Sequence, residues 1–339
     1  MMSARYKLLV GILVALVLIV LPLFLPTYPV FVLTTMLIFA IFAMSQDIMM
    51  GYLGFTSFGH AAFFGMGAYA VVISALRLGQ SFGLNLSIGL IAVVVMALLF
   101  GLVALRTSGL QFIMISLALA QGLWGLAYRW VSVTGGDNGL SGLARPQLPI
   151  VGSLSDPYSY YYFVLVVFAI VLGVLSVLVR SPFGLSWRGI RDSEIRMQML
   201  GYHTWFHKYV AYVISGFFGG VAGILNAYLT GYVSPDAISL NTSAMAILTV
   251  ILGGPGTLLG PTLGAAVVIL MRQAVSSVTD RWSLVLGAIY ILTIMFLPGG
   301  LLGTAARILG RVKVPTKVTA PRQQAGSARE KVENMTHAP

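Results

Sequence analysis

The chain has 339 residues, of which 58% are hydrophobic and only 9% are charged. A soluble domain is typically about 25% charged, so this composition excludes an ordinary soluble protein and requires lipid as its main surroundings. The sequence contains no cysteine, which excludes disulfides, thiolate nucleophiles and cysteine metal sites. Four histidines and nine acidic residues leave little for metal binding or acid–base catalysis.

The formal net charge of +11 is concentrated in a few short segments. Positive residues gather around 180–208 and in the tail that begins after Arg307. Charges beside membrane spans set the orientation of a protein, whereas binding to nucleic acid uses a basic face with interleaved aromatic residues, which is absent here. The charge therefore indicates topology and argues against a nucleic-acid partner.

The first apolar run resembles a signal peptide. Pro22, Pro26 and Pro29 follow it in place of a small-x-small cleavage site, so we expect a retained first span. Length and apolar character predict six clear spans, at 8–25, 30–50, 84–105, 158–180, 207–230 and 282–298.

Four further elements lie between the clear spans. Residues 57–76 are rich in Gly and Ala, and residues 109–130 are apolar with a few polar positions. Residues 241–276 are interrupted by Gly-Gly-Pro-Gly at 253–256 and by Gly-Pro at 260–261, which predicts two elements. The sequence therefore predicts an all-α, polytopic transmembrane helical bundle of about ten crossings.

The distribution of basic residues predicts the orientation. With a cytoplasmic N-terminus, ten crossings return the C-terminus to the cytoplasm, and Arg106, the loop 180–208 and the tail all lie inside. Five of the 20 Lys and Arg residues then lie outside: Arg77, Arg129, Arg145, Arg272 and Arg281. We expect one permease domain at 1–309, with a periplasmic loop at 131–157 and a cytoplasmic loop at 180–208. A polar stretch at 310–339 predicts a disordered cytoplasmic tail.

The cytoplasmic loop contains the most informative local pattern. Leu185, Ile190, Ile195 and Met199 recur at spacings of four and five, which predicts one short helix at 185–200 with an apolar side, and Gly201 is placed to end it. Two interpretations remain open. The helix rests on lipid headgroups, or it docks a cytoplasmic partner.

Several motifs occur in an order that resembles a known family. They are Gly-Tyr-Leu-Gly at 51–54, Ser-Phe-Gly-His-Ala-Ala-Phe-Phe at 57–64, Gly-Ala-Tyr at 67–69, Thr-Gly-Gly-Asp-Asn-Gly-Leu at 134–140, Arg-Asp-Ser-Glu at 191–194 with Met-Leu-Gly at 199–201, Val-Ser-Pro at 233–235, Leu-Gly-Gly-Pro-Gly-Thr-Leu at 252–258 and Leu-Pro-Gly-Gly-Leu at 297–301. Each motif alone is weak. The ordered set, over about 40–300, resembles the M-type permease family of branched-chain amino acid ATP-binding-cassette importers.

This resemblance implies a transport subunit and not an enzyme, in the bacterial inner membrane. It implies a second, H-type permease, two ATP-binding subunits and a periplasmic substrate-binding protein as partners, with alternating access driven by ATP hydrolysis. The partner subunits would use ATP and Mg, and this chain would bind no cofactor or metal. The sequence has no Gly-x-x-x-x-Gly-Lys-Ser/Thr motif, which excludes the usual P-loop ATPase. Branched-chain amino acids are the expected substrate, with urea, short amides and other amino acids as alternatives.

The resemblance and the local patterns assign three groups of candidate residues, and none of them is catalytic. For coupling to the ATPase they are Arg188, Arg191, Asp192, Glu194 and Gly201. For the translocation path they are Gly59, His60, Gly65, Gly253, Gly254 and Gly256. For contact with the binding protein they are Gly135, Gly136, Asp137, Asn138 and Gly139.

Several of these residues have a structural alternative. Glycines in spans also let helices pack closely, and His60 suits a hydrogen-bonded packing role as well as a proton relay. Asp47 is the only acid inside an apolar run, and we expect it to reach water at the end of its span. Gln46, Gln111, Gln121, Asn226 and Asn241 can face a path or join helices.

Two other classes of protein were weighed against the permease. An ion-driven secondary transporter buries carboxylates or paired charges in its spans, and here Asp47 alone is a candidate. A membrane-embedded enzyme needs a catalytic cluster, and the sequence has neither His-Glu-x-x-His nor Gly-x-Ser-x-Gly. Dependence of uptake on ATP separates the permease from the secondary transporter.

Overall fold

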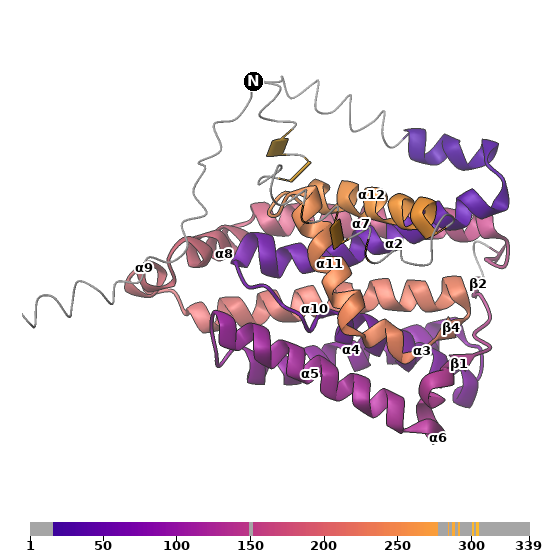
Figure 1. Ribbon diagram of the computed structural model, residues 1–339, viewed down its shortest axis with the longest axis horizontal. Coiled ribbons are helices and arrows are strands. Elements are labelled where there is room, and N and C mark those ends of the chain that lie inside the picture. The colour runs from indigo at the N-terminus through magenta and orange to yellow at the C-terminus, as the bar shows by residue number, and fades with distance from the viewer. Residues whose placement is uncertain are drawn as a thin grey trace, which may run out of the picture. The chain divides into compact units, whose positions relative to one another are not determined.

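A computed structural model describes residues 16–148 and 152–276, together with scattered positions between 284 and 304. These residues are mostly helical and belong to one compact unit, residues 1–304 (Figure 1). A second unit, residues 305–339, lies outside the described residues, as does the expected tail at 310–339. The expected spans at 8–25 and 282–298 are described only in part.

Within the described residues, seven helices are long and apolar enough to cross a membrane. They are α2 with its π-helical extension η2 (Thr27–Asp47 and Ile48–Leu53), α3 (His60–Leu78), α4 (Phe82–Ala104), α5 (Leu110–Arg129), α7 (Pro157–Arg180), α10 (Thr204–Thr230) and α12 (Leu259–Ser276). Six of them coincide with expected spans, at 30–50, 57–76, 84–105, 109–130, 158–180 and 207–230.

The break expected within 241–276 is also confirmed, since α11 (Leu240–Gly253) and α12 are separate helices. However, α11 has only 14 residues. At about 1.5 Å per residue it is roughly 21 Å long, which is shorter than the ~30 Å hydrocarbon core of a bilayer. It is therefore too short for the full crossing that we expected from this element.

Short elements connect the long helices. They are η1 (Leu21–Phe24), α6 (Val131–Thr134), η3 (Gly136–Asn138), β1 (Leu140–Ser141), β2 (Gln147–Leu148), β3 (Gly152–Ser153), α8 (Pro182–Asp192), α9 (Glu194–Met199), β4 (Tyr232–Val233) and η4 (Pro235–Ile238). The strands form two antiparallel pairs. Leu140 pairs with Val233, which joins β1 to β4, and Gln147 pairs with Ser153, which joins β2 to β3.

Helix ends follow local sequence signals. Asp156 accepts hydrogen bonds from the backbone N of Tyr158 (3.2 Å) and Ser159 (3.1 Å), and Pro157 occupies the first turn of α7. Ser181 caps α8 in the same way through the backbone N of Gly184 (3.3 Å), with Pro182 in the first turn. Side-chain oxygens satisfy the free N–H groups of a helix start, and proline tolerates that position because it has no N–H to satisfy.

The structure divides the expected helix at 185–200 into α8 and α9, so the prediction of one continuous helix was wrong. Ser193 lies between them in an extended conformation (φ −166°, ψ 105°). Its hydroxyl accepts a hydrogen bond from the backbone N of Arg196 at 3.4 Å and caps α9. Serine can either continue a helix or cap the start of a new one through its side chain. Ser193 adopts the capping conformation, so the first helix ends before it. The end after Met199 agrees with the stop expected at Gly201.

The centre of the bundle consists of α3 and α10, with α2 packed against them. A Cβ atom added to Gly223 of α10 would overlap the backbone O of Phe64 in α3, and one added to Gly67 of α3 would overlap the backbone O of Gly220. These glycines bring two helix backbones together, as is common in membranes, where close packing takes over from the hydrophobic effect.

Most side chains of the outer helices α4, α5 and α7 are at least partly exposed. Those side chains are apolar, for example Ile91, Met114 and Val177. Such faces suit contact with lipid and would be unstable in water. We call the end of the bundle with α8 and α9 the α8 end, and the opposite end, with α6, β1 and β4, the β1 end (Figure 1).

Candidate functional site

The helix α8 packs one face against the bundle and exposes its charged face. Trp187 and Ile190 are buried, and the indole Nε1 of Trp187 donates a hydrogen bond to the backbone O of His207 at 3.1 Å. Arg188, Arg191 and Asp192 are exposed. The buried face fixes α8 to the start of α10, and the charged residues remain accessible at the α8 end.

The apolar side expected from Leu185, Ile190, Ile195 and Met199 does not form one buried face. Only Ile190 is buried, whereas Leu185, Ile195 and Met199 are 55%, 65% and 80% exposed. Residues five apart point about 140° away from each other on a helix, and the break at Ser193 ends the periodicity. The apolar residues of α9 therefore form an exposed surface at the α8 end.

Arg191 connects α8 with the end of α2. Its Nη1 donates a hydrogen bond to the backbone O of Gly51 in η2. Arg188 lies over the ring of Tyr52, with 5.1 Å between the guanidinium carbon and the ring centroid, which is the geometry of a cation–π contact. Two of the residues expected to couple to an ATPase thus contact η2 directly.

Asp47 joins α2 to the connection between α11 and α12. Its Oδ1 accepts a hydrogen bond from the backbone N of Gly256 at 2.7 Å, and its Oδ2 accepts one from the backbone N of Leu258 at 3.2 Å. The side chain is fully buried, so the expectation that Asp47 reaches water was wrong. The break supplies two free N–H groups that replace water as hydrogen-bond donors.

Gly51 allows close contact at the junction where η2 and α2 meet the α11–α12 connection. An added Cβ would overlap both the Asp47 carboxylate and the backbone of Gly256. Gly51 therefore lets η2, α2 and the α11–α12 connection meet at one place, with Arg191 on the outside. Gly256, which we expected in the translocation path, lies in this junction.

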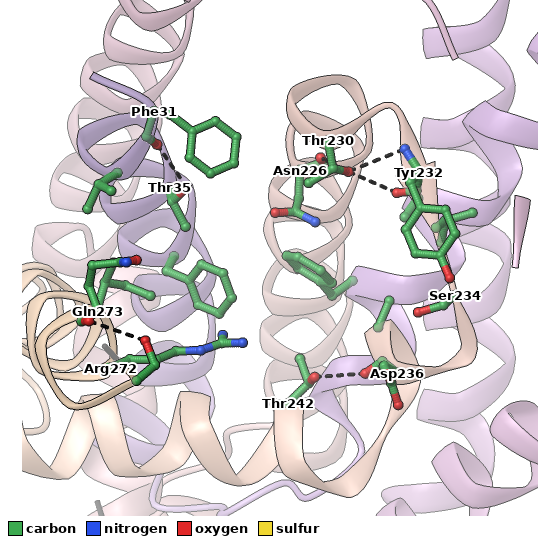
Figure 2. Close-up of a pocket in the computed structure, with 18 residues that line it drawn as sticks. Phe31, Thr35, Asn226, Thr230, Tyr232, Ser234, Asp236, Thr242, Arg272 and Gln273 are labelled. Atoms are coloured by element: carbon green, nitrogen blue, oxygen red, sulfur yellow. Dashed lines mark hydrogen bonds between the residues drawn. The ribbon is translucent and has the colours of Figure 1, made fainter. Parts of the chain in front are cut away.

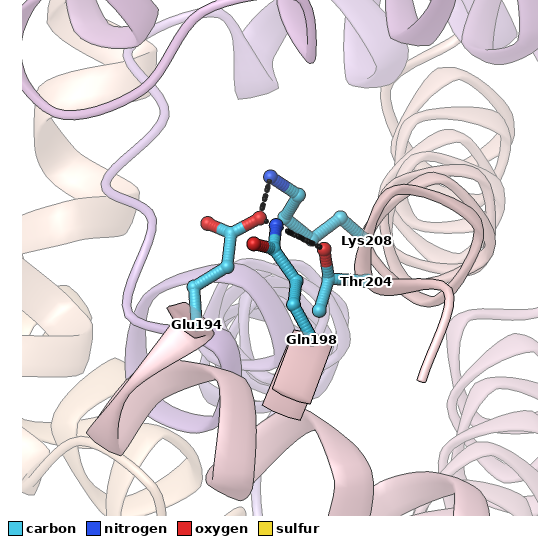
Figure 3. A network of polar contacts seen from close by, with 4 residues as sticks. All are labelled: Glu194, Gln198, Thr204 and Lys208. Carbon is cyan, nitrogen blue, oxygen red and sulfur yellow. Dashed lines mark hydrogen bonds and ion pairs between the residues drawn. The ribbon is translucent and has the colours of Figure 1, made fainter. Parts of the chain in front are cut away.

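Glu194 forms an ion pair inside the chain (Figure 3). Its Oε1 lies 2.6 Å from Nζ of Lys208 and accepts a hydrogen bond from the hydroxyl of Thr204 at 3.0 Å. Gln198 donates to the same hydroxyl at 3.2 Å. The Lys208 side chain is only 8% exposed and the Glu194 side chain 29%. These contacts attach α9 to the first two turns of α10.

The loop expected to contact a binding protein forms a tight turn at the β1 end. Gly135, Gly136 and Gly139 all have positive φ, and the turn includes η3. The hydroxyl of Tyr232 donates to the backbone O of Asn138 at 3.1 Å, which joins this turn to β4. Asp137 and Asn138 are exposed, so their side chains are available on this surface.

The remaining residues expected in a path lie inside helix contacts. A Cβ added to Gly59, Gly65 or Gly253 would overlap the backbone O of Ser116, the side chain of Ile238 or the backbone O of Gly260, respectively. Gly254 is buried beside Gly253. These positions are tightly packed in this structure, and their part in a path stays a prediction.

His60 is buried among aromatic and hydroxyl groups. Its Nε2 lies 2.7 Å from the hydroxyl of Ser45, and its ring stacks on Phe42 with centroids 5.4 Å apart. The side chain is 1% exposed. This environment is the one expected of a hydrogen-bonded packing histidine.

A cavity of about 520 Å³ lies between α2, α12 and the end of α10 (Figure 2). Its volume is within the ~300–1,000 Å³ range of small-molecule sites. Phe39 and Phe64 contribute apolar surface, and Arg272 and Asp236 are the two charged residues among the described residues that line it. Arg272 belongs to α12 and Asp236 to η4.

Sequence reasoning missed the role of several residues. Arg272 was counted only for topology, Asp236 was assigned no role, and Asp47 was noted without its partners. A contact between Asp47 and Gly256 joins residues 209 positions apart, and no local pattern encodes such a distance. The available signal was a lone acid in one span together with a glycine-rich break in another, because a buried carboxylate in a membrane must find hydrogen-bond donors.

Comparisons with known proteins support one family. Residues 28–295 match the family described as branched-chain amino acid transport system / permease component. The high-affinity branched-chain amino acid transport system permease protein LivM of Escherichia coli (strain K12) is 28% identical over 292 residues, which cover 79% of this chain and 68% of that protein. The LivH permease protein of the same transport system in Salmonella typhimurium is 26% identical over 284 residues, covering 78% of this chain and 91% of that protein.

Proposed function

This chain belongs to the family of branched-chain amino acid transport permeases, and from that membership we propose that it is a permease subunit of an ATP-binding-cassette importer. It moves branched-chain amino acids across the bacterial inner membrane by alternating access. ATP hydrolysis takes place in separate subunits, which use ATP and Mg, so this chain needs no cofactor of its own.

One observation carries the proposal: a series of contacts links the exposed α8 to the helices that line the cavity. Arg191 of α8 binds the backbone O of Gly51 in η2, and Asp47 of α2 binds the backbone of Gly256 and Leu258 before α12. Both α2 and α12 carry walls of the cavity. Because packed helices move as rigid bodies, a displacement of α8 is transmitted to the cavity.

The exposed surface of α9 and its flanks supports docking of an ATPase. Ile195, Met199 and Leu200 are 65%, 80% and 72% exposed, and Arg188 and Asp192 are exposed on the preceding helix, α8. Exposed apolar side chains with a charged rim are typical of protein interfaces. This arrangement favours a docking surface for a cytoplasmic partner.

The proposed topology places the α8 end in the cytoplasm and the β1 end in the periplasm. It has about ten crossings with both termini inside, and in this count η4 and α11 together make one crossing. Arg180, Arg188, Arg191, Arg196 and Lys208 then lie on the cytoplasmic side, which agrees with the positive-inside rule. The turn at 135–139 faces the periplasm, where it contacts a substrate-binding protein.

The proposed assembly contains a second, H-type permease and two ATP-binding subunits. Purification of this chain from native membranes in mild detergent tests the assembly. We expect a P-loop ATPase and a second permease to co-purify. Recovery of this chain alone as a stable monomer would overturn the proposal and favour an ion-driven secondary transporter.

A pair of variants assigns the contact to α9. Met199→Glu places a charge in the exposed apolar surface, and we expect it to lose the ATPase during purification while retaining the second permease. Ser132→Glu changes an exposed residue at the β1 end and serves as the matched control, which retains both partners. Retention of the ATPase by Met199→Glu would exclude this surface as the docking site.

Energy dependence and substrate are measured on the reconstituted complex. We expect uptake of leucine, isoleucine and valine to stop when ATP is depleted and to continue in the presence of an uncoupler. The opposite response would identify a secondary transporter. Uptake of urea or a short amide in place of branched-chain amino acids would keep the importer class and change its substrate.

A further inference from the structure

The cavity between α2, α12 and α10 presents one positive and one negative side chain on different walls. Arg272 comes from α12, which lies beside α2, and Asp236 comes from η4 on the other side (Figure 2). The guanidinium of Arg272 extends from α12 toward the space between the walls. The other described residues that line the cavity are uncharged.

The negative wall is held in place by local hydrogen bonds. The hydroxyl of Thr242, at the start of α11, donates to the backbone O of Asp236 at 2.9 Å. Ile238, two residues later, packs against Gly65 of α3, where a Cβ would overlap its side chain. A fixed backbone at 235–238 limits the reorganisation that ligand binding requires.

Apolar side chains share the lining of the cavity with the two charged residues. Phe39 and Phe64 belong to α2 and α3, and Ile269 lies one turn before Arg272 on α12. These side chains form a hydrophobic surface next to the charged groups. A site of this kind fits a ligand with an apolar body and two opposite charges, because each charge is neutralised and the body leaves water.

We propose that this cavity is a substrate site within the permease that binds an amino acid as its zwitterion. Arg272 binds the α-carboxylate, Asp236 binds the α-ammonium group, and Phe39, Phe64 and Ile269 surround the apolar side chain. The inference rests on the proposed function and deepens it. Urea and short amides carry neither charge, so the lining selects amino acids over those alternatives.

The chemistry of the pair supports this assignment. A guanidinium binds a carboxylate through two parallel N–H donors, and a carboxylate accepts from an ammonium group in a charge-assisted hydrogen bond. An isolated charge in a membrane is costly, whereas each charge of a bound zwitterion meets an opposite charge of the lining. The site therefore lowers the barrier for a polar headgroup on its way across the bilayer.

Cysteine labelling tests the site directly, because the chain has no native cysteine. Thr35 lines the cavity, and its hydroxyl bonds only to the backbone O of Phe31 in its own helix (2.9 Å) among the contacts described, so Thr35→Cys is a mild change. Ser132→Cys lies on α6 outside the lining and serves as the control. Both proteins are studied as the complete complex in vesicles, without the binding protein.

Three compounds with similar apolar groups are compared for how strongly each slows the reaction of the cysteine with a polar maleimide. L-leucine carries both charges, 4-methylpentanoate lacks the amine, and 3-methylbutan-1-amine lacks the carboxylate. We expect leucine to slow labelling at position 35 and each one-charge compound to need an about 10- to 100-fold higher concentration, since hydrogen bonds to charged groups have this strength. Labelling at position 132 stays constant.

Added substitutions identify the two partners. With Arg272→Gln, we expect leucine to lose its advantage over 3-methylbutan-1-amine, and with Asp236→Asn its advantage over 4-methylpentanoate. Arg272→Lys retains the charge and preserves most of the protection. Equal protection by the three compounds, or no protection by leucine up to its solubility limit, overturns the zwitterion site even if every substituted protein misfolds.

The outcome is separable from that of the proposed function. Uptake of leucine by the parent complex with its binding protein tests the importer. If uptake is present and the labelling results fail, only the zwitterion site is wrong. If labelling shows the expected selectivity but uptake does not depend on ATP, the site stands and the importer assignment fails.

Discussion

Asp47 illustrates how a single carboxylate can be retained inside a membrane span. An isolated charge in hydrocarbon is costly, but this carboxylate accepts two backbone N–H groups that the break before α12 leaves free. The backbone N–H groups of Gly256 and Leu258, which the break leaves without helical partners, are paired with this carboxylate. Each part explains the other, since a glycine-rich interruption in the membrane needs acceptors and a buried carboxylate needs donors.

Asp47→Asn should destabilise the protein. The asparagine oxygen can accept from one of the two N–H groups, while its NH₂ faces the other and leaves a buried donor unpaired. We expect the free energy of unfolding to fall by about 1–3 kcal/mol, measured by denaturation in detergent with thermal melting as a second readout. Asp137→Asn, at an exposed loop position, is the control and should change little. Equal stability of the two variants would contradict the role of Asp47.

The ion pair between Glu194 and Lys208 is a second contact at the scale of single residues. Glu194→Gln should lower the free energy of unfolding by about 1–3 kcal/mol, less than the roughly 3–5 kcal/mol of a fully buried pair, because the Glu194 side chain is 29% exposed. The exchanged pair Glu194→Lys with Lys208→Glu should recover part of the loss. Asp192→Asn, exposed on the neighbouring helix, is the control. An exchange no more stable than Glu194→Gln would exclude a direct ionic contribution.

At the scale of elements, the contact between α3 and α10 depends on the absence of side chains. Gly67, Gly220 and Gly223 lie where an added Cβ would meet the backbone or side chains of a neighbouring helix. Lipid is as apolar as leucine, so burying larger side chains between these helices would gain little. Close approach increases the van der Waals contact on which helix association depends.

Gly223→Ala should separate α3 from α10. Its Cβ would overlap the backbone O of Phe64, which cannot move aside as a flexible side chain can. We expect a loss of about 1–3 kcal/mol in the free energy of unfolding from overpacking. Gly125→Ala in α5 is the matched control, because no atom lies within 4 Å of the added Cβ. It should be neutral or stabilise by up to about 1 kcal/mol through helix propensity. Similar effects at both positions would exclude packing as the cause.

For the whole molecule, the positions of α2 and α12 matter most. Each begins or ends at the α8 end in the junction of Gly51, Asp47 and Gly256, and each carries a wall of the cavity. One junction can therefore move both walls together. Arg191 attaches this junction to α8.

Arg191→Ala should uncouple the ATPase from transport. Without the hydrogen bond to the backbone O of Gly51, movement of α8 no longer reaches η2. We expect uptake by the reconstituted complex to fall about tenfold or more, as for loss of a hydrogen bond from a charged group, while ATP hydrolysis continues. Arg129→Ala, exposed at the last residue of α5, lies outside α8 and α9; it is the control and should retain uptake. Parallel loss of ATP hydrolysis in Arg191→Ala would indicate failed assembly in place of uncoupling.

The sequence alone determined the class of protein and the position of most spans. Apolar length and charge distribution predict membrane helices because each helix satisfies its own backbone in lipid, independently of its neighbours. Six expected spans correspond to long helices, and the interruption before α12 was anticipated from Gly and Pro. The ordered motifs led to the family that the comparison with known proteins confirms.

The tertiary structure decided which residues meet. The partners of Asp47, Arg191 and Glu194, the break at Ser193, the shortness of α11 and the opposing charges of Arg272 and Asp236 all depend on contacts or caps that compete with local pattern. A periodic pattern reports the surroundings of one element, whereas a junction or a cavity forms only where several elements pack together. For this reason the sequence predicted which segments are membrane helices, and only the folded chain brought Arg272, Asp236 and the apolar lining of the cavity together.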